Sequence, residues 1–141
     1  MELLGLHSEE KMIQYFTWNE LIHTDTGLPN TPNDINVIAN LVQLARILDY
    51  LRIYFGKPIK VNSGYRSKEV NSAVGGVATS HHLFGYAADI TSDDLSELKK
   101  AVLANKHFFD QIILYPNFVH VSVAPLMRHQ VIDKSSNINK D

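Results

Sequence analysis

The sequence predicts an α+β fold in which a small antiparallel sheet packs against helices. Two observations lead to this expectation: helical and strand patterns are interspersed along the chain, and the last two short strand patterns flank a tight turn at Pro116-Asn117. Strands joined by such a turn run antiparallel, whereas a parallel βαβ unit needs a much longer crossover. With 141 residues, the chain has the usual size of one globular domain.

Helical signals dominate the first half of the chain. Thr17 and Glu20 have the spacing of a capping box and predict a helix over residues 18–23. A longer helix is expected over residues 34–55, where apolar residues recur at three- and four-residue spacing, and Gly56 ends it. Its apolar stripe consists of Ile38, Leu41, Val42, Ala45, Leu48 and Leu51.

Short strands and turns dominate the second half. Strand patterns cover residues 60–64, 87–91, 111–115 and 118–123. Short helices are expected over residues 67–74, capped by Ser67, and over residues 93–104, capped by Ser92. After Arg128 the chain is polar and aperiodic. We therefore expect a single domain over residues 1–128 and a fraying polar tail over residues 129–141.

Composition excludes several classes of function. The net charge of −2 gives no reason to expect nucleic acid or an anionic membrane as a partner. Cysteine is absent, so disulfides, thiolate catalysis and cysteine metal sites are excluded, and any metal must be held by His and carboxylate side chains. Residues 1–16 lack a basic segment followed by a sustained apolar stretch, so we expect no signal peptide and a chain that is cytoplasmic at synthesis.

Three residues form a candidate metal site. Asp89 lies in the apolar strand pattern YAADI, where an unpaired carboxylate is costly to bury and therefore needs a cation or several donors. His82 lies in the glycine-rich loop before that strand. In FVHVSV, alternation places His120 on the face opposite the valines, where a neighbouring strand could present Asp89.

Two imidazoles and one carboxylate leave a fourth position open on a metal, which is typical of a catalytic zinc site. Zinc lowers the pKa of a bound water to about 7 and polarises a carbonyl group. From the spacing alone another interpretation stays open. His120 is then a satisfied half-buried residue of its strand, and Asp89 is a local cap.

The run VNSGYRSKEVNSAVGGVATSHHLFGYAADI, followed by FDQIILYPNFVHVSV, resembles the zinc D-Ala-D-Ala carboxypeptidases and their phage endolysin relatives. The shared pattern is Ser-x-His, six residues, Asp, and a distal His-x-Ser, and the resemblance covers roughly residues 15–125. It implies the fold of the DD-peptidases and the Hedgehog signalling domain. It also implies a zinc peptidase that cleaves peptidoglycan stem peptides, as a D-Ala-D-Ala carboxypeptidase or as an endopeptidase.

The resemblance also implies roles for individual residues. His82, Asp89 and His120 match the three zinc ligands; the neighbouring His81 is a rival ligand, but it would change the spacing to Asp89. Ser80 matches a substrate-binding serine.

The SGYR motif adds two further expected site residues. Arg66 matches an arginine that supports the oxyanion or the substrate carboxylate, a role that suits a guanidinium with its forked donors. Its neighbour Tyr65 joins the expected substrate-binding residues.

The general base is the part of the pattern from which this sequence departs. Some branches place a carboxylate three residues before the distal zinc histidine, where this chain has Asn117. The candidates that remain are Asp110, taken first as the catalytic base, with Tyr115 and His81 as the others. Asn117 favours an alternative, a catalytically silent zinc-containing binding module like the Hedgehog domain.

Arg66 and Ser80 argue against that alternative, because a pure binding module has less need of groups that hold a substrate carboxylate. We expect a monomer that binds neither nucleic acid nor membrane. It would act on the cell wall after release from the cell, or within a phage or secreted assembly.

Overall fold

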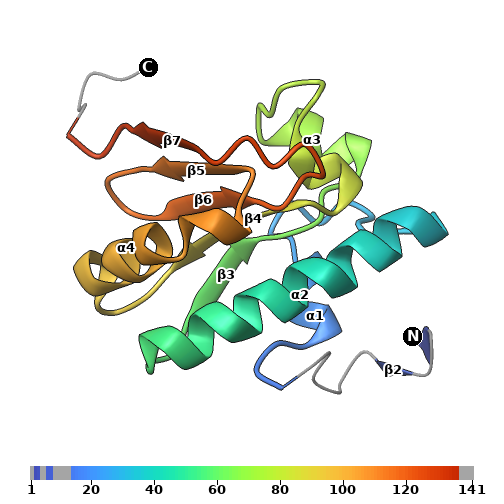
Figure 1. Ribbon diagram of the computed structural model, residues 1–141. Coiled ribbons are helices and arrows are strands. Elements are labelled where there is room, and N and C mark those ends of the chain that lie inside the picture. Colours follow the sequence, from blue (N-terminus) through green and yellow to red (C-terminus); the bar gives the residue numbers. More distant parts are fainter. Residues whose placement is uncertain (1, 4–5, 8–13, 137–141) are drawn as a thin grey trace.

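The computed structural model describes residues 2–3, 6–7 and 14–136. Much of residues 1–16, on which the expectation about a signal peptide rests, lies outside this part of the chain. In chain order the elements are β1 (Glu2–Leu3), β2 (Leu6–His7), α1 (Trp18–Ile22), α2 (Ile35–Phe55), β3 (Lys60–Ser63), α3 (Lys68–Ala73), η1 (His81–Phe84), β4 (Ala87–Thr91), α4 (Leu95–Ala104), η2 (Lys106–Phe108), β5 (Gln111–Leu114), β6 (Val119–Ser122) and β7 (Gln130–Asp133) (Figure 1).

The predicted α+β class is confirmed, with one change in the sheet. Within the described residues the main sheet has five strands in the order β3-β4-β6-β5-β7. The pairs β3–β4, β4–β6 and β6–β5 are antiparallel, as predicted. β7 instead pairs parallel to β5, with Gln111 opposite Gln130 and Leu114 opposite Asp133. The sheet is therefore mixed, and the prediction of a purely antiparallel sheet is wrong at this edge.

β7 also contradicts the expected fraying of residues 129–141. Gln130 N donates to Asp110 O at 2.9 Å, and Lys134 N donates to Leu114 O at 2.7 Å. Backbone hydrogen bonds therefore hold this strand at the sheet edge. Most of its side chains are exposed, so an edge strand of this kind needs no apolar repeat that a sequence pattern would reveal. Residues 137–141 lie outside the described part of the chain.

The helix ends follow the predicted caps. The capping box before α1 is present, and Gly56 ends α2 in the left-handed conformation, with φ 78°. Asp34, expected as the first residue of α2, is instead its N-cap. Ser67 caps α3. At α4 the expected cap is wrong, because Asp94 caps the helix and Ser92 accepts a hydrogen bond from Asp94 N instead.

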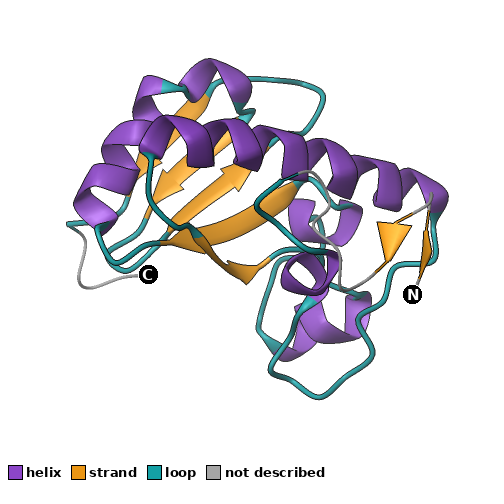
Figure 2. Cartoon of the chain, turned by 90° about the horizontal axis from the view of Figure 1, so that it is seen from below, coloured by secondary structure: helices purple, strands orange, loops and turns teal. Residues whose placement is uncertain are grey.

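One face of the sheet packs against helices. Figure 2 shows α2, the longest helix, crossing this face, and α4 contacts both α2 and β5. The buried apolar side chains of α2 and of the covered sheet face are Ile38, Leu41, Leu44, Ala45, Leu48, Leu51, Val61, Ala88, Ile90, Ile112, Leu114, Val119 and Val121. Along α2 this is the predicted stripe, except that Leu44 belongs to it and Val42 is only partly buried. The opposite sheet face carries the candidate site.

No helix in the described part of the chain combines the length and the apolar character that a membrane span requires.

Candidate functional site

Strand pairing places Asp89 and His120 side by side. Asp89 in β4 lies directly opposite His120 in β6, and Asp89 Oδ1 is 2.9 Å from His120 Nδ1. The alternation predicted for β6 is confirmed, since Val119 and Val121 are buried in the core. His120 and Asp89 therefore lie on the sheet face that the helices leave open.

His82 joins this pair from η1. Ser80 caps η1 by accepting a hydrogen bond from His82 N at 3.2 Å, which fixes the backbone of the histidine. His82 Nδ1 lies 2.7 Å from Gly64 O, and His82 Nε2 lies 3.3 Å from Asp89 Oδ1. One ligand atom from each of His82, Asp89 and His120 lies within 4.8 Å of the other two.

Gly64 links this histidine to the N-terminal helix. A Cβ atom at Gly64 would collide with the backbone carbonyl of Leu21 in α1, so only glycine fits where the two segments touch. The next residue continues the contact, because Tyr65 N donates to Leu21 O at 2.8 Å. The glycine of the SGYR motif thus serves packing, and its carbonyl group orients the His82 ring.

The hydrogen bonds of the cluster leave two acceptor atoms facing each other, an arrangement that a bound cation would stabilise. Gly64 O can only accept, so Nδ1 of the neutral His82 ring carries the proton and Nε2 presents a lone pair. This lone pair faces Asp89 Oδ1, a second acceptor, at 3.3 Å. Two zinc bonds of about 2.0–2.1 Å in a tetrahedron separate their donor atoms by about 3.3 Å. Two imidazoles and a carboxylate also suit zinc, so the residues fit this metal.

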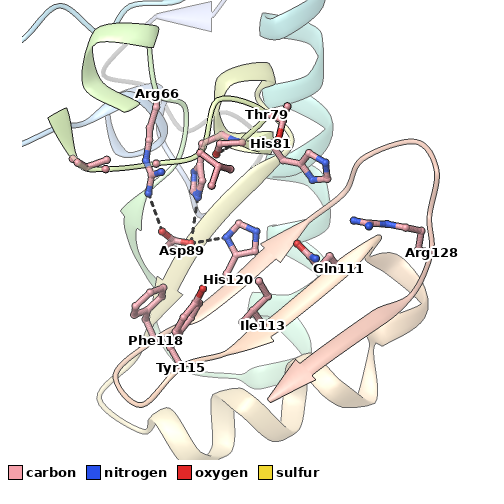
Figure 3. A pocket seen from close by; sticks show the side chains of 16 residues that line it. Arg66, Thr79, His81, Asp89, Gln111, Ile113, Tyr115, Phe118, His120 and Arg128 are labelled. Atoms are coloured by element: carbon pink, nitrogen blue, oxygen red, sulfur yellow. Dashed lines mark hydrogen bonds and ion pairs between the residues drawn. The ribbon is translucent and has the colours of Figure 1, made fainter. Parts of the chain in front are cut away.

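Asp89 is held as a carboxylate. It is 9% exposed, and burial alone would raise its pKa, but the hydrogen bond with His120 and the close contact with His82 outweigh burial and hold the pKa far below its usual value. Arg66 Nη2 donates at 3.3 Å to Oδ2, the Asp89 oxygen that does not face the histidines (Figure 3). The group therefore stays ionised and ready to bind a cation.

Arg66 is fixed by three partners. Besides Asp89, it donates from Nε to Ser63 Oγ at 3.1 Å and from Nη1 to Asn71 Oδ1 at 3.3 Å. Asn71 is itself buried and donates from Nδ2 to Val77 O at 2.9 Å. Burial lowers the pKa of Arg66, and the nearby Asp89 opposes this shift. The structure thus brings Arg66 to the site, where its main contact is with Asp89, whose carboxylate it orients.

The cluster opens into a pocket of about 630 Å³. The pocket is lined by Arg66, Val74, Gly75, Gly76, Val77, Thr79, Ser80, His81, His82, Asp89, Gln111, Ile113, Tyr115, Phe118, His120 and Arg128. Figure 3 shows the stacked rings of Tyr115 and Phe118 on one side of the cluster, with Gln111 and Arg128 on the other. Among the described residues, Asp89 is the only carboxylate that lines it.

The structure does not support Asp110 as a catalytic base. Its side chain is 1% exposed and does not line the pocket. Both carboxylate oxygens accept hydrogen bonds from Arg128, at 2.7–3.2 Å from the guanidinium and 2.8 Å from the backbone N. These bonds lower the pKa of Asp110, which makes it a weak proton acceptor. Asp110, just before β5, therefore has a structural role as the partner of Arg128.

Tyr65 is also absent from the pocket, contrary to expectation. Its ring packs against the core, and its carbonyl oxygen accepts a hydrogen bond from Asn30 Nδ2 at 2.9 Å. Burial is the main cause that raises its pKa. Tyr65 therefore holds the SGYR segment against the N-terminal part of the fold, while its neighbour Arg66 reaches the site.

Two further expectations concern His81 and Asn117. His81 lines the pocket, but its Nδ1 lies 2.7 Å from Ser122 Oγ, so His82 and not His81 lies beside Asp89. Burial lowers the pKa of His81. Asn117 is exposed on the β5–β6 turn and does not line the pocket, so this position could not aim a carboxylate at the cluster without a change of the turn.

Part of the pocket wall carries no motif that would mark it in the sequence. Gln111 and Ile113 were not expected at the site; they alternate along β5 with Tyr115, a candidate base from the sequence, and Ile113 lies directly opposite His120. One signal could have identified Gln111 and Ile113. Side chains alternate along both strands of this hairpin, so the residues of β5 on the same face as His120 could have been assigned to the site. No periodic pattern places Arg128 at the site, because it follows an irregular segment.

Comparison with known proteins agrees with this geometry. A zinc D-Ala-D-Ala carboxypeptidase of Streptomyces albus G is 42% identical over 57 residues, which cover 40% of this chain and 22% of the relative. The match thus spans about a fifth of that protein's length. The sequence model of the peptidase M15 family matches residues 14–122. Since this match covers most of the chain, the chain belongs to the peptidase M15 family.

Proposed function

We propose that the chain is a zinc-dependent peptidase that hydrolyses peptide bonds in bacterial peptidoglycan. The observation that carries the proposal is the assembly of His82, Asp89 and His120 into one cluster in the lining of a pocket. Membership of the peptidase M15 family supports the reaction class, and the carboxypeptidase relative supports zinc and a cell-wall peptide.

The proposed ligand atoms are His82 Nε2, His120 Nδ1 and Asp89 Oδ1. When bound there, zinc supplies Lewis acidity that polarises the scissile carbonyl and acidifies a water molecule. The chain keeps these atoms ready before binding: Gly64 O orients the His82 ring, and Arg66 holds the second oxygen of Asp89. Such supporting contacts typically change metal affinity by about 10–100-fold.

The substrate would lie between the two sides of the pocket. Arg66 has N–H groups beyond those bonded to Asp89, Ser63 and Asn71, and these would donate to a substrate carbonyl or carboxylate. Ser80 lines the pocket beside His82 and would contact the peptide backbone.

Proton transfer needs a group other than a pocket carboxylate. The side chain of Tyr115 points toward the Asp89–His120 pair (Figure 3), so we assign it the proton-transfer position. His81 is the second candidate because it also lines the pocket.

Product analysis of purified peptidoglycan tests this function. The zinc-loaded chain should release peptide products identified by mass spectrometry, a chelator should abolish release, and added zinc should restore it. Free D-Ala as the sole product would identify a carboxypeptidase, whereas larger fragments would identify an endopeptidase. His120→Ala provides an inactive control. Release that persists unchanged in both His120→Ala and the chelated protein would refute the zinc mechanism.

A catalytically silent binding module is the second candidate. The pocket's lack of a carboxylate base, among the described residues, favours it. Under this alternative the chain would bind peptidoglycan and retain zinc, and no product would appear after prolonged incubation. The same digestion, combined with a sedimentation assay for wall binding, separates the two.

A further inference from the structure

Arg128 forms one end of the pocket without a role in the site described so far. It lies in the connection between β6 and β7, and Figure 3 shows its guanidinium group pointing back into the pocket toward Gln111. Its side chain is 40% exposed, although it makes an ion pair with a carboxylate that is 1% exposed. A purely structural arginine would not need to reach the pocket.

The ion pair with Asp110 occupies one edge of the guanidinium group only. Arg128 Nε lies 3.0 and 3.2 Å from the two carboxylate oxygens of Asp110, and Nη2 lies 2.7 Å from Oδ2. Arginine has five N–H donors, of which this contact uses the Nε and one Nη2 hydrogen. The end formed by Nη1 and the second Nη2 hydrogen stays available, and it matches a second carboxylate in bidentate geometry.

The backbone that presents Arg128 is held in an unusual conformation. Met127 and His129 flank it with φ 48° and 56°, and they are the only non-glycine residues with positive φ in the described part of the chain. Arg128 N donates to Asp110 Oδ1 at 2.8 Å, and His129 Nδ1 bonds to Phe109 O at 3.0 Å. Strain of this kind persists only where surrounding contacts impose it, and it often marks a binding position.

Asp110 lies outside the pocket, and the described pocket residues beside Arg128 are polar and carry no negative charge. Gln111 and His81 line the same end of the pocket, and His81 Nδ1 is engaged with Ser122 Oγ. The opposite end holds the Tyr115–Phe118 ring stack, whose centroids lie 4.6 Å apart. The pocket thus has a polar, cationic end and an aromatic end, with the His–Asp–His cluster between them.

We propose that Arg128 binds a carboxylate of the substrate and that the site selects peptides with an acidic residue at the Arg128 end of the pocket. Asp110 acts as a positioning residue that fixes the guanidinium, so little side-chain entropy is lost when the substrate binds. This inference rests on the proposed function, because it names a feature of the peptide that the same site would take.

Matched peptides test the proposal. Pairs that end in D-Ala-D-Ala would differ in one side chain, glutamate or glutamine, and that residue would move along the peptide from pair to pair. Calorimetry would give Kd for each peptide with the zinc-loaded chain. For the pair that reaches Arg128, the wild type should bind the glutamate peptide about 10–100-fold more tightly. Arg128→Gln should bring that ratio close to one, and Arg128→Lys should leave it intermediate.

A control variant and a binding measurement distinguish this proposal from the proposed peptidase activity. Arg46→Gln removes an exposed cation of α2 outside the pocket and should leave the ratio unchanged. If Arg128→Gln fails to fold, Arg128→Lys carries the comparison. A ratio near one for every pair in the wild type, or a ratio retained in Arg128→Lys and Arg128→Gln, overturns the proposal. A ratio lost in the variants without any hydrolysis supports Arg128 and refutes the peptidase function instead.

Discussion

Asn71→Ala should lower both the free energy of unfolding and the kcat/KM of the proposed reaction. The buried amide of Asn71 bonds to Arg66 Nη1 at 3.3 Å and to Val77 O at 2.9 Å, and the substitution removes both contacts. A hydrogen bond to a charged group contributes about 1.5–3 kcal/mol and a neutral one about 0.5–1.5 kcal/mol. The free energy of unfolding should therefore fall by about 2–4 kcal/mol. Arg66 keeps Ser63 and Asp89 as partners, so kcat/KM should fall only about 10-fold, less than in Arg66→Ala.

Urea unfolding at saturating zinc measures the first effect, because Trp18 is the single tryptophan and is 2% exposed, which makes its fluorescence a reporter of the core. Asn71→Asp retains an acceptor for Arg66 and loses the donor to Val77 O, so it should retain more activity than Asn71→Ala. Asn62→Ala, at an exposed asparagine of β3, is the matched control. An Asn71→Ala protein with unchanged kcat/KM would refute the idea that Asn71 positions Arg66.

Four further predictions follow from the site. Asp89→Ala should lose bound zinc, measured by metal analysis; full retention would remove Asp89 from the ligand set. Arg66→Ala should lower kcat/KM by about 10²–10³-fold, and Arg66→Lys should recover little because an ammonium cannot reproduce the fork; unchanged kinetics would exclude the role. Tyr115→Phe should lower kcat by about 10²-fold, whereas Asn117→Glu should give no gain, since position 117 does not line the pocket; a large gain would identify a catalyst that lacks a base. Arg128 holds the pKa of Asp110 below its ordinary value of 3.8, so this stabilisation is complete above that pH and is lost as the pH falls through the folded-state pKa. Asp110→Asn should therefore cost more stability in urea titrations at pH 7 than at pH 3; an equal cost at both values would contradict the ion-pair argument.

Local signals predicted the ends of α1 and α2 and the strands that carry Asp89 and His120, whereas His82 was expected in a loop and lies in the short helix η1. The capping box, the glycine end of α2 and the alternation in β6 each depend on residues close in sequence, and all three are present in the structure. The alternation was enough to place His120 opposite a neighbouring strand, where Asp89 lies.

Contacts between distant segments could not be predicted in this way. The pairing of Arg128 with Asp110 and the parallel addition of β7 depend on where the chain returns after β6, and no periodicity records this path. Tyr65 shows the opposite error. The SGYR motif indicated the site, but its two side chains point in different directions: Arg66 contacts Asp89, and Tyr65 packs against the core. A motif identifies a segment, and the strand geometry decides which of its side chains reaches the pocket.

The register between β4 and β6 decides whether the candidate metal site forms. A slip of one residue would place Ala88 opposite His120 and turn the histidine toward the helices, because side chains alternate between the two faces of a strand. Only the native register brings the imidazole beside Asp89. A cation that binds this pair therefore stabilises one alignment of the two central strands over its neighbours. Zinc held by these residues would therefore favour the native strand alignment as well as the proposed reaction.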